Sequence, residues 1–124
     1  MNVPNELFYA KTHEWARKEG NKVYVGITDH AQHEITDIVH VELPEVGKKF
    51  SKSQPCAVVE SVKSAFDIYS PVSGTVVEVN EELLSSPEII NQSPYEKGFF
   101  FVLEIENESE LKELMSAEDY KKSL

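Results

Sequence analysis

The sequence predicts a mainly β fold, either a small flattened β-barrel or a sandwich, decorated by helices. Three observations support this prediction. Apolar and β-branched residues recur in short runs of strand length, and Gly, Pro, Ser and Asn separate these runs. Helical patterns are confined to one short internal segment and to the C-terminus. The chain has 124 residues, 40% of them apolar, so we expect residues 1–124 to form one domain with a modest core.

The first clear strand pattern is followed by a helix with a recognisable start. Residues 22–27 alternate apolar and polar side chains, so they predict a strand with one buried face. Thr28 follows this strand and can accept a hydrogen bond as the N-cap of a helix at residues 29–35. Asp29 in the first turn suits the positive end of the helix dipole. Residues 38–43 form the next predicted strand.

The second half of the chain contains a predicted hairpin, two further strands and two helical segments. Residues 55–62 and 66–69 are rich in β-branched and aromatic side chains, so we expect two strands joined by a short turn. The remaining predicted elements are strands at 75–79 and 99–105, a loop at 84–94, and helical segments at 110–115 and 116–119, the last opened by a capping box.

Lys63 lies at the tip of the predicted hairpin and is the most informative residue of the chain. A tip lysine presents its amine far from the core, which a modifying enzyme needs if it is to acylate one lysine among many. A lysine amine is protonated and a poor nucleophile at neutral pH, whereas an amide formed on it is an uncharged tether. The local pattern by itself favours an ordinary solvated turn lysine over an acylated one. The surrounding sequence decides between these two interpretations.

The charge balance excludes some classes of partner. The net charge of −10, from 12 basic and 22 acidic residues, argues against binding to nucleic acid. A strongly acidic surface keeps a protein soluble and monomeric and can steer it toward basic patches on partners. No apolar run approaches the length of a membrane span. The N-terminus lacks a signal or transit pattern, so we expect a cytoplasmic protein, or a mitochondrial-matrix protein if a transit peptide has been removed.

The sequence contains neither a recognised metal-binding motif nor a recognised catalytic motif. Cys56 is the only cysteine, and no Cys/His cluster has zinc spacing, so we expect no internal disulfide and no bound metal. A small acid–base enzyme would use histidines beside carboxylates. The candidates are His13, Glu14, His30, His33, Glu34 and His40. Their spacing matches no recognised catalytic motif, so this alternative is weak.

Six segments of the chain form a series that occurs in the same order in a known family. The segment around the tip reads Glu-Ser-Val-Lys-Ser-Ala at residues 60–65 and continues through 67–74. The others lie at residues 9–15, 26–32, 41–47, 86–91 and 93–95. Each segment is similar to the corresponding part of glycine cleavage system H proteins, and the first resembles their lipoyl-attachment segment. Together the resemblance covers residues 2–120.

The resemblance implies a fold, a cofactor and partners. The fold would be a barrel-sandwich hybrid, a lipoyl-domain-like flattened β-barrel with its core at about 22–104 and a C-terminal helical extension at about 109–124. Lipoate would be attached as an amide to Lys63 of a non-catalytic carrier for the aminomethyl group of glycine. The implied partners are glycine decarboxylase, aminomethyltransferase, dihydrolipoyl dehydrogenase and a lipoate ligase or octanoyltransferase. Thr12, Glu14 and Asp67 would lie in the cleft that shelters the loaded arm.

Other carriers and adaptors remain alternatives. A lipoate-relay carrier would use the same arm to donate lipoyl groups to other proteins. A biotinyl carrier typically places its lysine between two methionines, whereas Val62 and Ser64 flank Lys63 here. Lipoyl domains of 2-oxoacid dehydrogenases usually sit in longer chains with flexible linkers. An acidic adaptor domain would leave Lys63 unmodified.

The chain departs from the family pattern at several positions. Thr36 stands where many members have glycine, at the end of the predicted helix, and a β-branched residue is costly in a left-handed conformation. Phe66 replaces a residue that is usually small or polar. His40 and Phe99 stand where members often have an aromatic residue and a tryptophan, and Glu34 where some have a histidine. We expect these departures to affect the cleft or enzyme docking rather than the attachment site.

Overall fold

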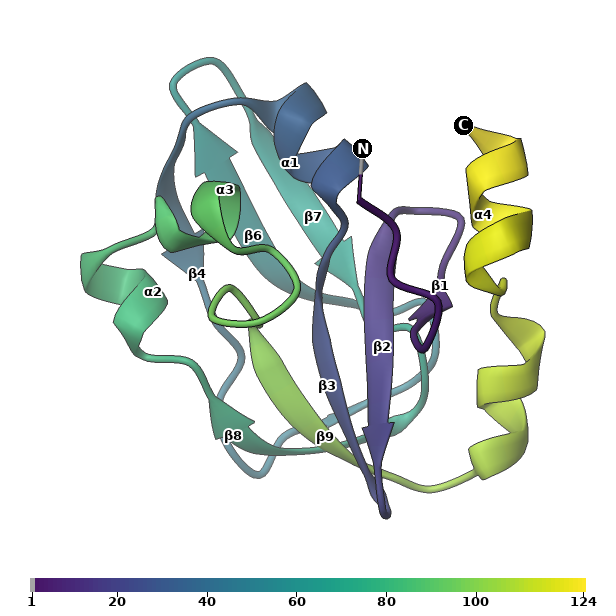
Figure 1. Cartoon of the computed structure of the whole chain (residues 1–124). Coiled ribbons are helices and arrows are strands. Elements are labelled where there is room, and N and C mark those ends of the chain that lie inside the picture. Colours follow the sequence, from purple (N-terminus) through teal and green to yellow (C-terminus); the bar gives the residue numbers. More distant parts are fainter. Residues whose placement is uncertain (1) are drawn as a thin grey trace.

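The chain folds into two antiparallel sheets that do not close into a barrel (Figure 1). A computed structural model describes residues 2–124. The larger sheet has the strand order β1-β2-β3-β9-β8-β5, and the smaller one has the order β4-β6-β7. The strands are β1 (Phe8–Tyr9), β2 (Glu14–Glu19), β3 (Lys22–Ile27), β4 (Ile38–Glu42), β5 (Lys49–Phe50), β6 (Pro55–Ser61), β7 (Ala65–Tyr69), β8 (Gly74–Val79) and β9 (Phe101–Ile105). The predicted mainly β fold is confirmed.

The six-stranded sheet includes two N-terminal strands that the sequence patterns did not reveal. β1 is only two residues long. β2 reads Glu-Trp-Ala-Arg-Lys-Glu, and its first half is buried while its second half is largely exposed, so it shows no alternation. It pairs with β3 in unbroken register, from Glu14 opposite Ile27 to Glu19 opposite Lys22. Pairing with an apolar neighbour, rather than its own composition, makes β2 a strand.

The predicted hairpin around Lys63 forms the centre and one edge of the three-stranded sheet. β6 pairs with β7, with Glu60 opposite Ala65 and Val58 opposite Asp67. β4 pairs with the other side of β6. Along β6, Val59 and its inward neighbours are buried, while the alternate residues are partly exposed. One face of this sheet therefore covers the core and the other meets solvent.

Two helices begin at the residues that their caps predicted. In α1 (Asp29–Ile35), the Thr28 hydroxyl accepts a hydrogen bond from the backbone N–H of Ala31 at 3.2 Å. In α4 (Ala117–Ser123), the Ser116 hydroxyl accepts one from an N–H in the first turn, also at 3.2 Å. The helical segment predicted just before α4 is the 3₁₀ helix η1 (Glu108–Glu113).

Residues 84–94 do not form the predicted loop. They contain the second half of α2 (Glu82–Ser85) and all of α3 (Ile89–Gln92), each a single helical turn. The side chains of Leu83 and Ile90 from these turns are fully buried. One turn is too short to display a helical period, so the Ser, Pro and Asn content of the segment concealed both helices.

Thr36 ends α1 in a conformation that side-chain-bearing residues rarely adopt. Its φ is 69° and its ψ is −144°. Its backbone N–H nevertheless donates to the carbonyl oxygen of Gln32 at 2.9 Å. The helix end therefore keeps the positive-φ geometry that glycine adopts freely, at a cost in backbone strain.

Two apolar clusters hold the fold together. The larger lies between the sheets, and the smaller joins Tyr9 and Trp15 of the N-terminal strands to Tyr120 of α4. The rings of Tyr9 and Tyr120 stack with their centroids 4.7 Å apart. Figure 1 shows α4 beside β1, the strand next to β2, as this second cluster requires. Within residues 2–124, no helix is both long and apolar enough to cross a membrane.

Candidate functional site

Lys63 is the middle residue of a three-residue turn between β6 and β7, with its side chain exposed. The backbone N–H of Ser61 donates to the carbonyl oxygen of Ser64 at 2.8 Å, which closes the hairpin just before its tip. The Ser61 hydroxyl oxygen accepts hydrogen bonds from the N–H groups of Lys63 and Ser64, both at 3.2 Å. One buried serine therefore fixes the backbone of the turn and leaves the lysine side chain in solvent.

Apolar side chains flank the exposed lysine. Val62, next to Lys63 in the turn, is 68% exposed, and Phe66 on β7 is 41% exposed, so the hairpin end also presents hydrocarbon surface. Among residues 2–124, no carboxylate forms an ion pair with Lys63. An acylating enzyme can therefore reach the amine without breaking an ion pair.

A second feature of functional interest is a cavity of about 460 Å³ between the N-terminal strands, the end of β7 and the segment after η1. Glu14 lines this cavity, and the side chain is almost completely buried. Its Oε2 accepts a hydrogen bond from the backbone N–H of Tyr69 at 3.0 Å, and its Oε1 accepts one from the Thr12 hydroxyl. Lys52 and Glu113, which also line the cavity, form an ion pair of 3.0 Å.

The environment of Glu14 disfavours its charged form. Burial raises the pKa of this carboxyl above its usual 4.5, and the hydrogen bonds from Thr12 and Tyr69 only partly oppose the shift. In the part of the chain that the structure describes, no Lys, Arg or His forms an ion pair with Glu14. A buried carboxylate without a cation is costly, so the cavity is chemically suited to a positively charged amine.

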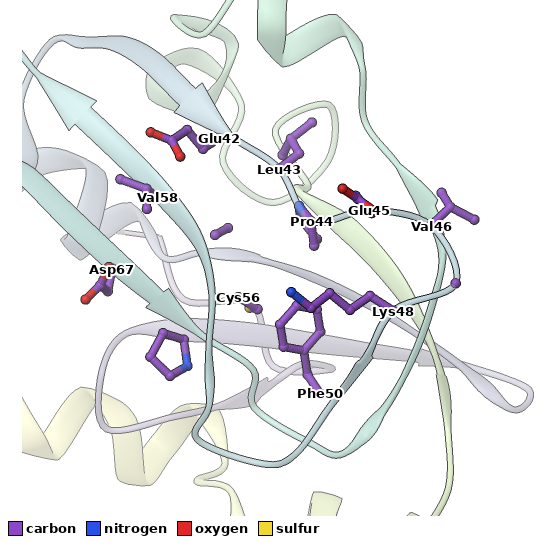
Figure 2. A pocket seen from close by; sticks show the side chains of 13 residues that line it. Glu42, Leu43, Pro44, Glu45, Val46, Lys48, Phe50, Cys56, Val58 and Asp67 are labelled. Carbon is purple, nitrogen blue, oxygen red and sulfur yellow. The ribbon is translucent and has the colours of Figure 1, made fainter.

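Asp67 does not share this cavity. It lies exposed on β7 opposite Val58 and lines a different cavity, of about 680 Å³, together with Lys48 and Cys56 (Figure 2). Burial raises the pKa of the Cys56 thiol to about 12, so this thiol stays protonated at neutral pH. The structure thus brings Thr12 and Glu14 together and leaves Asp67 apart. A role for any of the three in sheltering the arm stays a prediction.

Sequence reasoning missed two parts of the Glu14 cavity. One is the backbone N–H of Tyr69, which donates to the carboxylate. The other is the wall formed by Leu114 and Met115, which lie near the opposite end of the chain from Glu14. A backbone donor has no sequence signature, and a contact between distant segments leaves no local pattern.

Comparison with known proteins identifies the family. Residues 7–124 match the family described as glycine cleavage H-protein. The chain belongs to this family. It is 63% identical to the glycine cleavage system H protein of Endomicrobium trichonymphae, over 98% of each chain. It is 54% identical to the protein of the same name from Halalkalibacterium halodurans, over 99% of this chain and 96% of the other.

A solved structure supports the same conclusion. The crystal structure of a glycine cleavage system H protein from Mycobacterium marinum matches with a TM-score of 0.86 at 32% sequence identity. The match covers 98% of this chain and 100% of the other. The family and the fold that the sequence predicted, including the likeness to lipoyl domains, are therefore confirmed. Membership in the H-protein family also favours a lipoyl carrier over the biotinyl-carrier and acid–base enzyme alternatives.

Proposed function

We propose that Lys63 carries lipoate as an amide and that the chain thereby serves as the non-catalytic lipoyl carrier of a glycine cleavage system. The observation that carries the proposal is the position of Lys63, exposed at the tip of a hydrogen-bonded three-residue turn in a member of the glycine cleavage H-protein family. The resemblance of residues 60–65 to the attachment segment of that family supports the same lysine.

The residues around Lys63 suit covalent attachment of an acyl group. Because Ser61 holds the turn through its own hydroxyl, acylation of Lys63 breaks no hydrogen bond of the hairpin. The amide removes the charge of the amine and leaves a long tether on a fixed base. When attached, a lipoyl group supplies the redox and transfer chemistry of its dithiolane, and the chain supplies the anchor.

We further propose that the Glu14 cavity holds the amine of an aminomethyl cargo. A protonated amine would bring the positive charge that the buried carboxylate lacks, through a charge-assisted hydrogen bond. The Thr12 hydroxyl already donates to Glu14 and would keep its carboxylate oriented. Tyr69, which lines the cavity, is the last residue of β7, the strand that begins two residues after Lys63; six residues of extended chain span about 20 Å.

The proposed partners follow from the family. They are glycine decarboxylase, aminomethyltransferase, dihydrolipoyl dehydrogenase, and a lipoate ligase or octanoyltransferase that modifies Lys63. The net charge of −10 favours encounters with basic patches on these enzymes and disfavours self-association. We therefore propose a monomer that acts in the cytoplasm, in keeping with its bacterial relatives.

The test of the anchor is the intact mass of the full chain after incubation with lipoate, ATP and a lipoate ligase, followed by peptide mapping. We expect a single lipoyl adduct on the peptide that contains Lys63, and no adduct on Lys63→Arg. Lys97→Arg, which changes another exposed lysine, is the matched control and should be modified normally. The proposal would be contradicted by a lipoyl adduct on Lys63→Arg. It would also be contradicted if the wild type gained no adduct from a ligase that is active on another H protein.

A second assay separates the carrier from a lipoate relay. The lipoylated chain is mixed with glycine decarboxylase, and glycine-dependent exchange of carbon dioxide is measured. We expect exchange that depends on the lipoyl group. A lipoylated chain that supports no exchange but transfers its lipoyl group to a 2-oxoacid dehydrogenase would identify the relay instead.

A further inference from the structure

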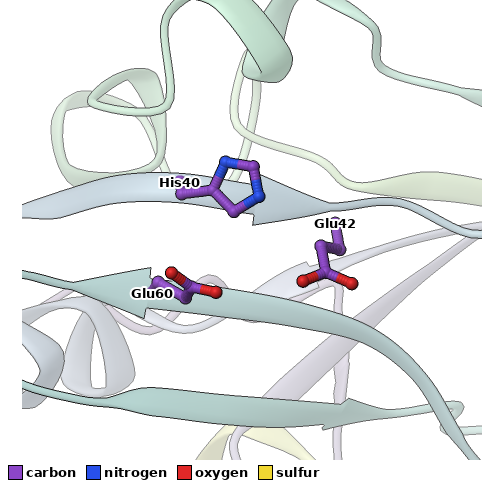
Figure 3. Close-up of side chains that lie close together, drawn as sticks. All are labelled: His40, Glu42 and Glu60. Carbon is purple, nitrogen blue, oxygen red and sulfur yellow. The ribbon is translucent and has the colours of Figure 1, made fainter.

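One histidine and two glutamates converge on the solvent face of the three-stranded sheet (Figure 3). His40 and Glu42 belong to β4, and Glu60 belongs to β6. His40 lies directly opposite Glu60 in the antiparallel register. Glu42 follows His40 by two residues, so its side chain lies on the same face. The pairing of two strands thus gathers three possible metal ligands at one place.

The distances between these side chains suit coordination of a single ion. Their ligand atoms all lie within 4.8 Å of one another. A tetrahedral zinc ion with bonds of about 2.0–2.1 Å holds its ligand atoms about 3.4 Å apart. Because His40 and Glu42 are exposed, small side-chain rotations can close that difference. The backbone beneath them is already fixed by strand pairing, so binding requires little further ordering.

The three side chains also lack other partners. Among residues 2–124, none of them forms an ion pair, and no residue supplies a cation to the two carboxylates. Two neighbouring carboxylates repel each other, and the net charge of −10 adds to that repulsion. A divalent cation would relieve this repulsion while it binds the imidazole.

We propose that His40, Glu42 and Glu60 form a binding site for a divalent transition metal of the zinc type. An imidazole nitrogen with carboxylate oxygens is a donor set that zinc accepts, whereas magnesium and calcium prefer oxygen ligands alone. Three protein ligands leave a coordination position for water. No metal site was predicted from the sequence, because only the spacing of cysteines and histidines was used to search for zinc ligands. Glu60 also lies far from His40 along the chain, so the cluster leaves no local sequence pattern.

The proposed metal site is separate from the anchor and the cavity. Lys63 supplies no ligand, and the Glu14 cavity is lined by other residues. A bound ion would link β4 to β6 and would stabilise the folded chain by mass action. Zinc binding at this site should therefore not depend on whether Lys63 carries lipoate.

The experiment is a calorimetric titration of the full chain with Zn²⁺ alone, performed on the unlipoylated chain and on the oxidised lipoylated chain. We expect one zinc per chain, and at least about tenfold weaker binding in His40→Ala and in Glu60→Gln. His33→Ala changes an exposed histidine on α1 and is the matched control, with affinity unchanged. Zinc should also raise the unfolding temperature of the wild type more than that of His40→Ala at the same zinc concentration.

Further variants distinguish this site from other zinc ligands. Cys56→Ser and Lys63→Arg should bind zinc as the wild type does, because neither residue belongs to the cluster. Absence of zinc binding by the wild type, equal affinity of the wild type and His40→Ala, or loss of binding in Cys56→Ser would each overturn the proposal.

Discussion

The Lys63 hairpin and the Glu14 cavity are built in opposite ways. At the hairpin the side chain is exposed, and a neighbouring serine fixes only the backbone. At the cavity the side chain is almost completely buried, and a hydrogen bond holds each carboxylate oxygen. An anchor that serves several enzymes has to protrude, whereas a site that retains an amine has to exclude water. The comparison teaches that an exposed side chain suits the proposed anchor, whereas a buried side chain suits the proposed amine site.

The largest effect should come from Lys63→Arg, which retains the charge but removes the proposed anchor. We expect a complete loss of carrier activity in a reconstituted glycine cleavage assay. The free energy of unfolding should change by less than about 0.5 kcal/mol, because the side chain packs against little. Urea denaturation measures the stability of the same preparation. Residual carrier activity in this variant would place the anchor elsewhere.

Glu14→Gln should have the next largest effect, on retention of the cargo. The substitution keeps the shape of the side chain but removes the charge-assisted hydrogen bond, worth about 1.5–3 kcal/mol. We expect a loaded carrier to release ammonia about tenfold faster in the absence of aminomethyltransferase. Asp67→Asn is the matched control, because Asp67 lies outside this cavity, and its release rate should not change. Equal release by Glu14→Gln and the wild type would remove Glu14 from the proposed role.

The stability of the folded chain should also depend on pH through His13, whose Nδ1 lies 2.7 Å from the Tyr120 hydroxyl oxygen. Burial, with a smaller effect of His30, lowers the pKa of His13 below its usual 6.5. The unfolded chain therefore takes up a proton at higher pH than the folded chain. The stability contributed by neutral His13 is present above pH 6.5 and is lost as the pH falls toward the lowered pKa.

Urea denaturation between about pH 7.5 and about pH 5.5 measures this loss. The comparison of the wild type with His13→Gln isolates the contribution of His13 from those of other groups. His13→Gln should lose less stability on acidification, while the exposed-site control His33→Gln should follow the wild type. Parallel curves for the wild type and His13→Gln would show that His13 does not titrate differently in the two states.

The smallest effect should come from Thr36→Gly, at a position that lines neither cavity. Relief of the positive-φ strain should stabilise the chain by about 1 kcal/mol. Thermal unfolding measures the change. Thr36→Ala is the control. Because alanine keeps the positive-φ strain, this variant should gain much less stability than Thr36→Gly. A glycine variant no more stable than the alanine variant would show that the strain is negligible.

Local sequence patterns predicted the elements whose causes are local. The N-cap Thr28 marked the start of α1, and the β-branched runs on either side of Lys63 marked the hairpin. The same patterns missed β2, which depends on pairing with β3, and the single turns α2 and α3, which are too short to show a period.

The candidate sites divide in the same way. The position of Lys63 could be predicted because three residues and their flanking strands define a hairpin tip. The cavity could be predicted only in part: Thr12 and Glu14 lie close in sequence, whereas its other wall comes from the C-terminal segment. The cluster of His40 and Glu60 depends on a cross-strand register that no local pattern contains.

The position of each site along the chain also sets the order of its assembly. The hairpin closes a turn of three residues, so the entropy cost of closing its loop is small and we expect it to form within microseconds. The cavity needs β1 to meet Met115, whose backbone N–H donates to the Tyr9 carbonyl oxygen at 2.7 Å. That contact spans most of the chain and forms late. During synthesis the hairpin leaves the ribosome first, so the proposed anchor at Lys63 takes shape while the cavity still lacks the wall formed by the C-terminal segment.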